Sequence, residues 1–270
     1  MRFLIAIPVY NEARYLPGVL AAVRRHARRS AAVPAAATWG GPGFARSAAE
    51  ILVVNDGSTD ATPALLARER GLHVIAHPEN RGYGQSLIDA FAFAAQHGYD
   101  WVITIDCDEQ HEPAQIPEFM AAAARGDADV LSGSRYLRTF AGDDDPPADR
   151  REINQTITKL VDQILGLTLT DSFCGFKAHR VAAMRRLRLD EPGYAFPLQF
   201  WVQCARAGLR VRELPVRRIY RDKSREFGGT LEDPAARLTH YLAVFVRELG
   251  REAPAAADWR SGICRCQQRE

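Results

Sequence analysis

The segment WVITIDCDEQHEP, residues 101–113, leads a strand-like apolar run directly into a cluster of acids, an amide and a histidine. Side chains alternate along an extended chain, so Asp106 and Asp108 project to one side and Cys107 to the other. Gln110 continues the first side. Carboxylate and amide oxygens suit Mg²⁺ or Mn²⁺, which keep coordination positions open for substrate phosphates. The segment predicts a buried strand that ends at a divalent-metal site. The alternative is a pair of acids that only caps the following helix.

Comparable apolar runs recur through the first half of the chain, and stretches with helical spacing separate them. The runs cover residues 3–10, 51–57, 73–78 and 128–136. Such an alternation is typical of buried parallel strands joined by helices. We therefore expect a single α/β domain with a Rossmann-like, mostly parallel central sheet flanked by helices. Ligands of such sheets bind beyond the carboxyl ends of the strands, where Asn11, Glu12 and Asp56 also fall.

Two irregular segments and a C-terminal region complete the organisation. Residues 31–49, rich in Ala, Gly and Pro, predict a surface insertion. The acidic, proline-containing residues 139–152 predict a mobile loop at the ligand edge, with a plain solvated linker as the alternative. Apolar spacing over residues 234–249 predicts an amphipathic helix, which a polar tail follows. We expect the main domain to cover residues 1–230 and the helix and tail to cover residues 231–270.

Composition limits the classes of function. The 35 basic and 33 acidic residues give a formal net charge of +2, which does not predict a nucleic-acid partner. No apolar stretch approaches the ~20 residues of a membrane-spanning helix. The five cysteines have neither the spacing of a zinc site nor that of a disulfide framework, so a reducing cytoplasm is expected. They are Cys107, Cys174, Cys204, Cys264 and Cys266.

Five short motifs follow one another in order along the chain. They are IPVYNE (residues 7–12), VVNDGSTD (53–60), ENRGYGQSL (79–87), DCDEQHEP (106–113) and GSRY (133–136). Together they resemble the family 2 glycosyltransferases of the GT-A fold, and within that family the dolichol-phosphate mannose synthase-like branch of polyprenyl-phosphate glycosyltransferases. The resemblance covers roughly residues 3–230, and several motifs in a fixed order are far more specific than two acids alone.

The resemblance implies roles for the residues of these motifs. The nucleotide-binding positions are Pro8, Tyr10, Glu12 and Asp56. The positions for the metal, Mg²⁺ or Mn²⁺, and the donor diphosphate are Asp106, Asp108 and Gln110. Arg135 matches a family arginine near the acceptor and the sugar. The expected catalytic set is therefore Asp106, Asp108 and Arg135.

Two later segments resemble parts of the same branch that lie near the site. DSFCGFK (residues 171–177) places Asp171 and Gly175 close to it, and RRIYRDKSREFGG (217–229) resembles a basic phosphate-binding segment. The expected phosphate- and acceptor-binding residues are Arg135, Lys177, Arg218, Ser224 and Arg225.

The implied reaction is the inverting transfer of a hexose from GDP-mannose or UDP-glucose to a polyprenyl phosphate, either dolichyl or undecaprenyl. An acceptor phosphate is already ionised near neutral pH, so it needs no general base. We expect a cytoplasmic enzyme that meets its lipid acceptor peripherally on the cytoplasmic face of a membrane or through a separate membrane partner.

One departure from the family pattern keeps alternatives open. GYAFPLQ (residues 193–199) carries Gln199 where a glutamate is expected, so a catalytically degenerate nucleotide-sugar-binding protein is one alternative. Transfer to a sugar or protein hydroxyl is another, and it needs a base, for which Asp190 or Glu191 is the candidate. A sugar-nucleotide pyrophosphorylase would carry a glycine-rich loop after the first strand, and AIPVYNE (residues 6–12) has no glycine.

Overall fold

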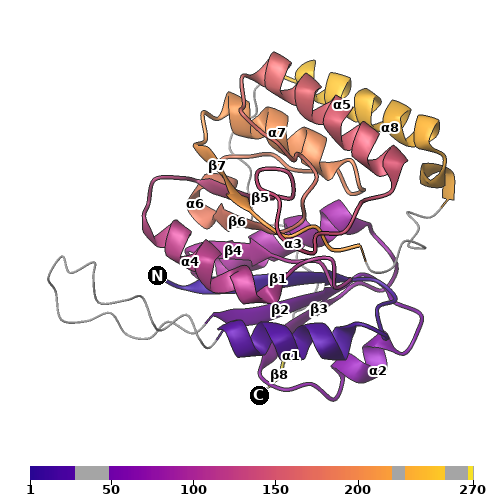
Figure 1. Cartoon of the computed structure of the whole chain (residues 1–270). Helices are drawn as coiled ribbons and strands as arrows, with labels where there is room; N and C mark the ends of the chain where they lie inside the picture. Colours follow the sequence, from indigo (N-terminus) through magenta and orange to yellow (C-terminus); the bar gives the residue numbers. More distant parts are fainter. Residues whose placement is uncertain (28–48, 221–228, 253–266, 270) are drawn as a thin grey trace, which may run out of the picture.

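The protein is described by a computed structural model over residues 1–27, 49–220, 229–252 and 267–269. Its strands are β1 (Phe3–Val9), β2 (Glu50–Asn55), β3 (Leu72–Ala76), β4 (Trp101–Thr104), β5 (Val130–Ser134), β6 (Lys177–Arg180), β7 (Val211–Pro215) and β8 (Gln267–Arg269). Within the described residues they form one sheet in the order β7-β5-β6-β4-β1-β2-β3-β8 (Figure 1). Neighbouring strands are parallel except at β6 and β8, which run antiparallel to theirs.

The helices alternate with the strands over most of the chain. They are α1 (Leu16–Ala27), α2 (Thr62–Leu66), α3 (Tyr83–Gln96), α4 (Ile116–Ala124), α5 (Ala148–Leu165), α6 (Val181–Met184), α7 (Phe196–Arg206) and α8 (Pro234–Leu249). Short 3₁₀ turns cover Pro113–Gln115 and Gly229–Glu232. The expected α/β architecture, a Rossmann-like and mostly parallel sheet flanked by helices in a single domain, is confirmed.

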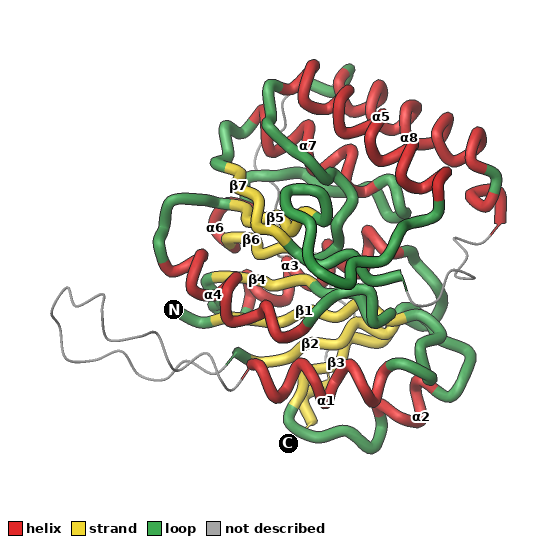
Figure 2. The backbone as a smooth tube through the Cα atoms, viewed as in Figure 1, coloured by secondary structure: helices red, strands yellow, loops and turns green. Residues whose placement is uncertain are grey.

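The two-residue period of β1 divides the core between two layers. Ile5 and Ile7 pack with the apolar faces of α1 and α4, whereas Leu4 and Ala6 face the opposite side, which α3 and α7 cover. Figure 2 shows α5, α7 and α8 side by side at one end of the molecule, and the three helices contact one another. The apolar face of α8, with Tyr241 buried in it, therefore packs on the domain.

The structure gives bounds for parts of the two irregular segments. Of the expected insertion at 31–49, only Ala49 lies within the described residues. Helix α5 begins at Ala148, so the irregular stretch expected at 139–152 ends at residue 147. The helix expected in the 231–270 region is α8. Among the residues that the structure describes, no helix combines the length and the apolar character needed to cross a membrane.

Candidate active site

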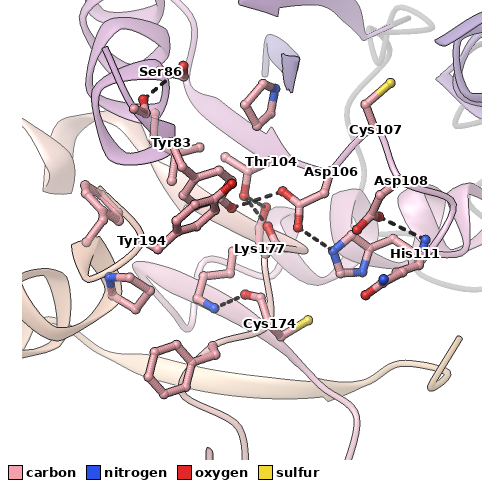
Figure 3. A pocket seen from close by; sticks show the side chains of 18 of the residues that line it. Tyr83, Ser86, Thr104, Asp106, Cys107, Asp108, His111, Cys174, Lys177 and Tyr194 are labelled. Carbon is pink, nitrogen blue, oxygen red and sulfur yellow. Dashed lines mark hydrogen bonds and ion pairs between the residues drawn. The ribbon is translucent and has the colours of Figure 1, made fainter. Parts of the chain in front are cut away.

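A cavity of about 730 Å³ lies beyond the carboxyl ends of β1, β2 and β4. Most of the residues expected at the site line it, and Figure 3 shows part of its wall. These are Pro8, Tyr10, Glu12, Asp56, Asp106, Asp108, Gln110, Arg135 and Lys177. Arg218 does not line the cavity, and Ser224 and Arg225 lie outside the described residues.

Asp106 follows β4 and has a hydrogen-bond partner on each carboxylate oxygen (Figure 3). The Tyr83 hydroxyl donates to Oδ1 over 3.0 Å, and His111 Nε2 lies 3.0 Å from Oδ2. Burial raises the pKa of Asp106, but the hydrogen bonds from His111 and Tyr83 outweigh burial, and the pKa lies below its ordinary value of 3.8. Asp106 is therefore a fixed carboxylate at neutral pH.

The donor set on this wall fits a hard divalent cation. Asp108 Oδ1 accepts the backbone N–H of Gln110 over 3.0 Å, which closes a tight turn and fixes this second carboxylate two residues from Asp106. The described residues contain no group of three or more His, Cys, Asp or Glu side chains that could hold a metal. A Mg²⁺ or Mn²⁺ site that also binds substrate phosphates needs only one or two carboxylates, so Asp106 and Asp108 with the Gln110 amide suffice.

Gly175 is required by the close approach of Asp106. A Cβ atom at position 175 would overlap the Asp106 carboxylate, so only glycine lets the segment before β6 pass this close to it. The Thr104 hydroxyl, at the end of β4, donates to the Gly175 carbonyl over 2.7 Å and holds the two segments together. The expectation that Gly175 lies near the acids is therefore met by direct packing.

The loops after β1 and β2 are hydrogen-bonded to each other. Asn11 adopts a φ of 56°, in the left-handed region that asparagine tolerates, and its Oδ1 accepts the N–H of Thr59 over 2.8 Å. Its own N–H donates to Ser58 Oγ over 2.9 Å, and the Glu12 N–H donates to Thr62 Oγ1 over 3.0 Å. These bonds place the two expected nucleotide-binding segments on one wall of the cavity.

Asp56, the last residue of that expected set, is buried and holds the start of α3. Its Oδ1 accepts the Arg81 N–H and its Oδ2 accepts the Gly82 N–H, each over 2.8 Å. Gly82 has a φ of 103°, which side-chain-bearing residues rarely adopt. His77 Nδ1 lies 2.6 Å from Oδ1. The 53–60 and 79–87 motifs are thus joined through one carboxylate.

Arg135 directly follows β5, lines the cavity and is held in a buried ion pair. Its Nε and Nη2 donate to the two oxygens of Asp171 over 2.7 and 2.9 Å, and its Nη1 donates to the Tyr220 hydroxyl over 2.6 Å. Burial raises the pKa of Asp171, but Arg135 and the hydrogen bonds around it outweigh burial and lower the pKa to about 2. Asp171 therefore fixes the orientation of the Arg135 guanidinium beside the cavity.

Lys177 and His179 lie on β6, and both residues line the cavity. The Lys177 ammonium donates to the Cys174 carbonyl and lies 5.3 Å from the ring of Trp201. Burial lowers the pKa of Lys177 from its ordinary value. Burial and the neighbouring lysine lower the pKa of His179 to about 3, so this imidazole is neutral.

Arg218 is engaged by the acidic loop that precedes α5. Its Nε lies 3.6 Å from Asp143 Oδ2, and its backbone N–H donates to Asp143 Oδ1 over 3.2 Å. Asp144 Oδ2 accepts the N–H of Tyr220 over 2.9 Å. This loop is therefore docked on the segment expected to bind phosphate, and Arg218 stays outside the cavity lining.

Comparisons with known proteins agree with the geometry. The family model described as Glycosyl transferase family 2 matches residues 4–188. The chain belongs to glycosyl transferase family 2. Among family 2 relatives, the undecaprenyl-phosphate mannosyltransferase of Micrococcus luteus is 30% identical over 251 residues, which are 89% of this chain and 94% of that protein. The polyprenol monophosphomannose synthase of Mycolicibacterium smegmatis is 27% identical over 80% of this chain and 76% of its own. These relatives confirm the resemblance to the polyprenyl-phosphate branch.

Solved structures confirm the GT-A fold of this family 2 chain. A glucosyl-3-phosphoglycerate synthase from Mycobacterium tuberculosis, crystallised with Mn²⁺, UDP and glucosyl-3-phosphoglycerate, superposes with a TM-score of 0.63. The match covers 92% of this chain and 80% of that one at 17% sequence identity.

Gln199, the departure from the family 2 pattern, is buried outside the cavity lining. Its Oε1 accepts the N–H groups of Asp190 and Glu191, each over 2.8 Å. Its Nε2 donates to Asp190 Oδ1 over 2.8 Å and to Glu248 Oε2 over 2.9 Å. All four hydrogen bonds of Gln199 join parts of the protein to one another. Glu248 on α8 supplies one of the two carboxylates that accept from its amide.

Three residues in or behind this family 2 site were not anticipated from the sequence: Tyr83, which lines the cavity, and His77 and Asp89, which do not. Tyr83 belongs to the ENRGYGQSL motif, but the motif did not predict its hydrogen bond to Asp106. Asp89 lies buried on α3 among apolar neighbours, and an acid on the apolar face of a helix was the available signal. His77 directly follows β3, at the ligand edge of the sheet.

Proposed function

We propose that this chain transfers a hexose from a nucleoside-diphosphate sugar to a polyprenyl phosphate, with inversion at the anomeric carbon. The donor is GDP-mannose or UDP-glucose. The names of the relatives from Micrococcus luteus and Mycolicibacterium smegmatis, which describe transfer to undecaprenyl phosphate and polyprenol monophosphomannose synthesis, support the acceptor class.

The observation that carries the proposal is the distribution of charge around the cavity. Four cationic side chains line it: Arg135, Arg150, Lys177 and Arg237. Asp190 and Glu191, the candidate bases for a hydroxyl acceptor, do not line it. Asp190 is paired with Arg251 over 2.8 and 2.9 Å, and Glu191 with Arg247 over 2.5 Å. A site with cations and without these bases suits an acceptor that arrives already ionised.

The residues divide the chemistry between two walls. A divalent cation held by Asp106 and Asp108 would stabilise the charge on the departing nucleoside diphosphate. The loops that carry Tyr10 and Asp56 hold the nucleotide. Arg135, oriented by Asp171, and Lys177 hold the anionic acceptor close to the anomeric carbon, so that one phosphate oxygen attacks in line. The Mn²⁺ and UDP in the solved structure of the Mycobacterium tuberculosis synthase support the metal-dependent donor site.

A lipid acceptor also implies where the reaction takes place. A polyprenyl chain stays in the bilayer while its phosphate lies at the headgroup level, so we propose that the protein works peripherally at the cytoplasmic face of a membrane, alone or with a membrane partner. The expected domain, residues 1–230, would supply most of the catalytic site, and Arg237 of α8 adds a cation to its lining.

The proposal is tested by a transfer assay with the purified chain. Vesicles containing undecaprenyl phosphate are incubated with GDP-mannose or UDP-glucose, with Mg²⁺, Mn²⁺ or EDTA, and the lipids are analysed by mass spectrometry and NMR. We expect one donor to yield a hexosyl phospholipid of inverted anomeric configuration, and EDTA to prevent it. Nucleotide binding without transfer to any acceptor would instead favour a degenerate nucleotide-sugar-binding protein.

A further inference from the structure

His77 lies between two carboxylates in the interior of the molecule, just after β3. Its side chain is 0% exposed. Nδ1 is 2.6 Å from Asp56 Oδ1, and Nε2 is 2.8 Å from Asp89 Oδ2, on α3. Arg81 and Gln85 also reach Asp89, the former with Nη1 3.4 Å from Oδ2 and the latter with Nε2 2.9 Å from Oδ1. His77 therefore connects the ligand edge of β2 to the side of α3.

Each of the two hydrogen bonds of His77, to Asp56 and to Asp89, requires a proton on its own ring nitrogen. A neutral imidazole carries one N–H, so it can donate to only one of two carboxylates, whereas an imidazolium donates to both. Burial lowers the pKa of His77, but the hydrogen bonds to Asp56 and Asp89 outweigh burial and raise the pKa to about 9. At neutral pH His77 is therefore a cation with a donor directed at each acid.

The contacts of Asp56 are unequal between its two oxygens. Oδ1 accepts from His77 and from the Arg81 N–H, whereas Oδ2 accepts from the Gly82 N–H. A carboxylate oxygen has about two lone-pair sites, so Oδ1 is filled and Oδ2 keeps acceptor capacity. Asp56 also lines the cavity. Because His77 and the Arg81 N–H fill Oδ1, Oδ2 is the oxygen of Asp56 that remains for a ligand.

We propose that His77, anchored by Asp89, is a positioning residue for the donor: it occupies Oδ1 of Asp56 and so presents Oδ2 to a ring N–H of the nucleobase. This inference rests on the proposed function, since it deepens the donor site that the function requires. Neither His77 nor Asp89 lines the cavity, so both act on the nucleotide only through Asp56.

Two isosteric substitutions separate orientation from charge. In His77→Asn the amide N–H₂ replaces Nδ1 and keeps the bond to Asp56, while in His77→Gln it replaces Nε2 and keeps only the bond to Asp89. Both variants lose the positive charge. Binding of GDP and of UDP, with Mn²⁺ present, is measured by calorimetry for each. We expect His77→Gln to weaken the tighter nucleotide by about tenfold or more and His77→Asn by about threefold or less.

Two further variants complete the experiment. His73→Asn removes the other histidine of this strand region, which bonds Glu50 away from the cavity, and it should bind like wild type. Asp89→Asn removes the negative charge that anchors His77 without touching Asp56, and it should weaken binding by about threefold to tenfold; it decides the matter if His77→Gln does not fold. Equal affinity in His77→Gln and His77→Asn, whether reduced or not, overturns the proposal. Failure of the wild-type chain to bind either nucleotide overturns the proposed donor site itself.

Discussion

Asp106 and Asp108 stand two residues apart but are supported differently. Asp106 is built into the wall by Tyr83 and His111, one on each oxygen, whereas Asp108 is held by a turn within its own loop. Replacing Asp108 therefore removes a carboxylate from the cavity and leaves the Tyr83–Asp106–His111 network in place. Asp108 is the better position at which to test the metal assignment.

Asp108→Ala should lower the transfer rate by at least roughly 100-fold, because the leaving diphosphate loses the stabilisation that a bound cation provides. Initial rates at saturating donor and Mn²⁺ measure the effect. Asp127→Ala is the matched control, since Asp127 is exposed, pairs with Arg212 and does not line the cavity. Turnover near the wild-type level in Asp108→Ala would contradict the metal assignment.

His77 makes the stability of the protein depend on pH. The folded-state pKa of about 9 lies above the ordinary value of 6.5, so its contribution is complete below about pH 6.5 and is lost as the pH rises through 9. Urea denaturation between pH 6 and pH 10 should therefore show the unfolding free energies of wild type and His77→Asn converging as the pH rises. A constant difference across this range would show that His77 is not charged in the folded protein.

The individual site residues were predictable from the sequence only where a motif marked them. The resemblance placed Pro8, Asp56, Asp106 and Lys177 in one cavity, and they line it. The bonds between His77 and its two acids were not predictable, because the acids lie 21 and 12 residues away on different elements. Hydrogen bonds between distant segments leave no periodic trace in a sequence.

At the scale of elements, the contact between α7 and α8 explains the departure at Gln199. Glu248 on α8 is buried, and its two oxygens accept from Gln199 and Gln203 on α7 over 2.9 and 2.7 Å. Arg251 lies 3.3 Å from the same carboxylate. The amide at position 199 and the acid at position 248 thus form one unit that joins the C-terminal helix to the domain.

Gln199→Glu should destabilise the protein by roughly 2–4 kcal/mol, because it puts a second buried carboxylate against Glu248 and Asp190. Glu248→Gln combined with it restores a donor and should recover more than half of the loss. Gln163→Glu, on the exposed face of α5, is the control and should change stability by less than about 0.5 kcal/mol. Urea denaturation measures all four chains. If Gln199→Glu is as stable as wild type, or if the double variant is no more stable than Gln199→Glu, this pairing is ruled out.

The elements were predictable to the extent that their apolar residues were periodic. The five expected strands of the first half match β1 to β5, since each is buried on both faces. Strand β6 was not expected, because Lys177–Arg180 is polar and its lysine and histidine face the cavity. Helix α5 begins at Ala148, inside the stretch 139–152 that was expected to be a loop, because its first turn is charged and has no apolar spacing.

At the scale of the whole molecule, the cavity joins two parts with different charges. The edge of β1, β2 and β4 contributes Glu12, Asp56, Asp106 and Asp108, and the part built from β5, β6, α5 and α8 contributes the cations. A sugar nucleotide with its metal suits the first wall, and an anionic acceptor suits the second. The class of acceptor is thus the property that follows most directly from this division of charge.

The most direct measurement compares three acceptors with the donor that the chain uses: a polyprenyl phosphate, the corresponding polyprenol, and 3-phosphoglycerate, each at equal concentration with Mn²⁺. Mass spectrometry of the products gives the rate for each. We predict that polyprenyl phosphate is glycosylated at least about 100-fold faster than the other two, because only it offers both an ionised oxygen and a lipid chain at a membrane surface. Transfer to polyprenol or to 3-phosphoglycerate at a rate equal to or above that of the lipid phosphate would contradict it.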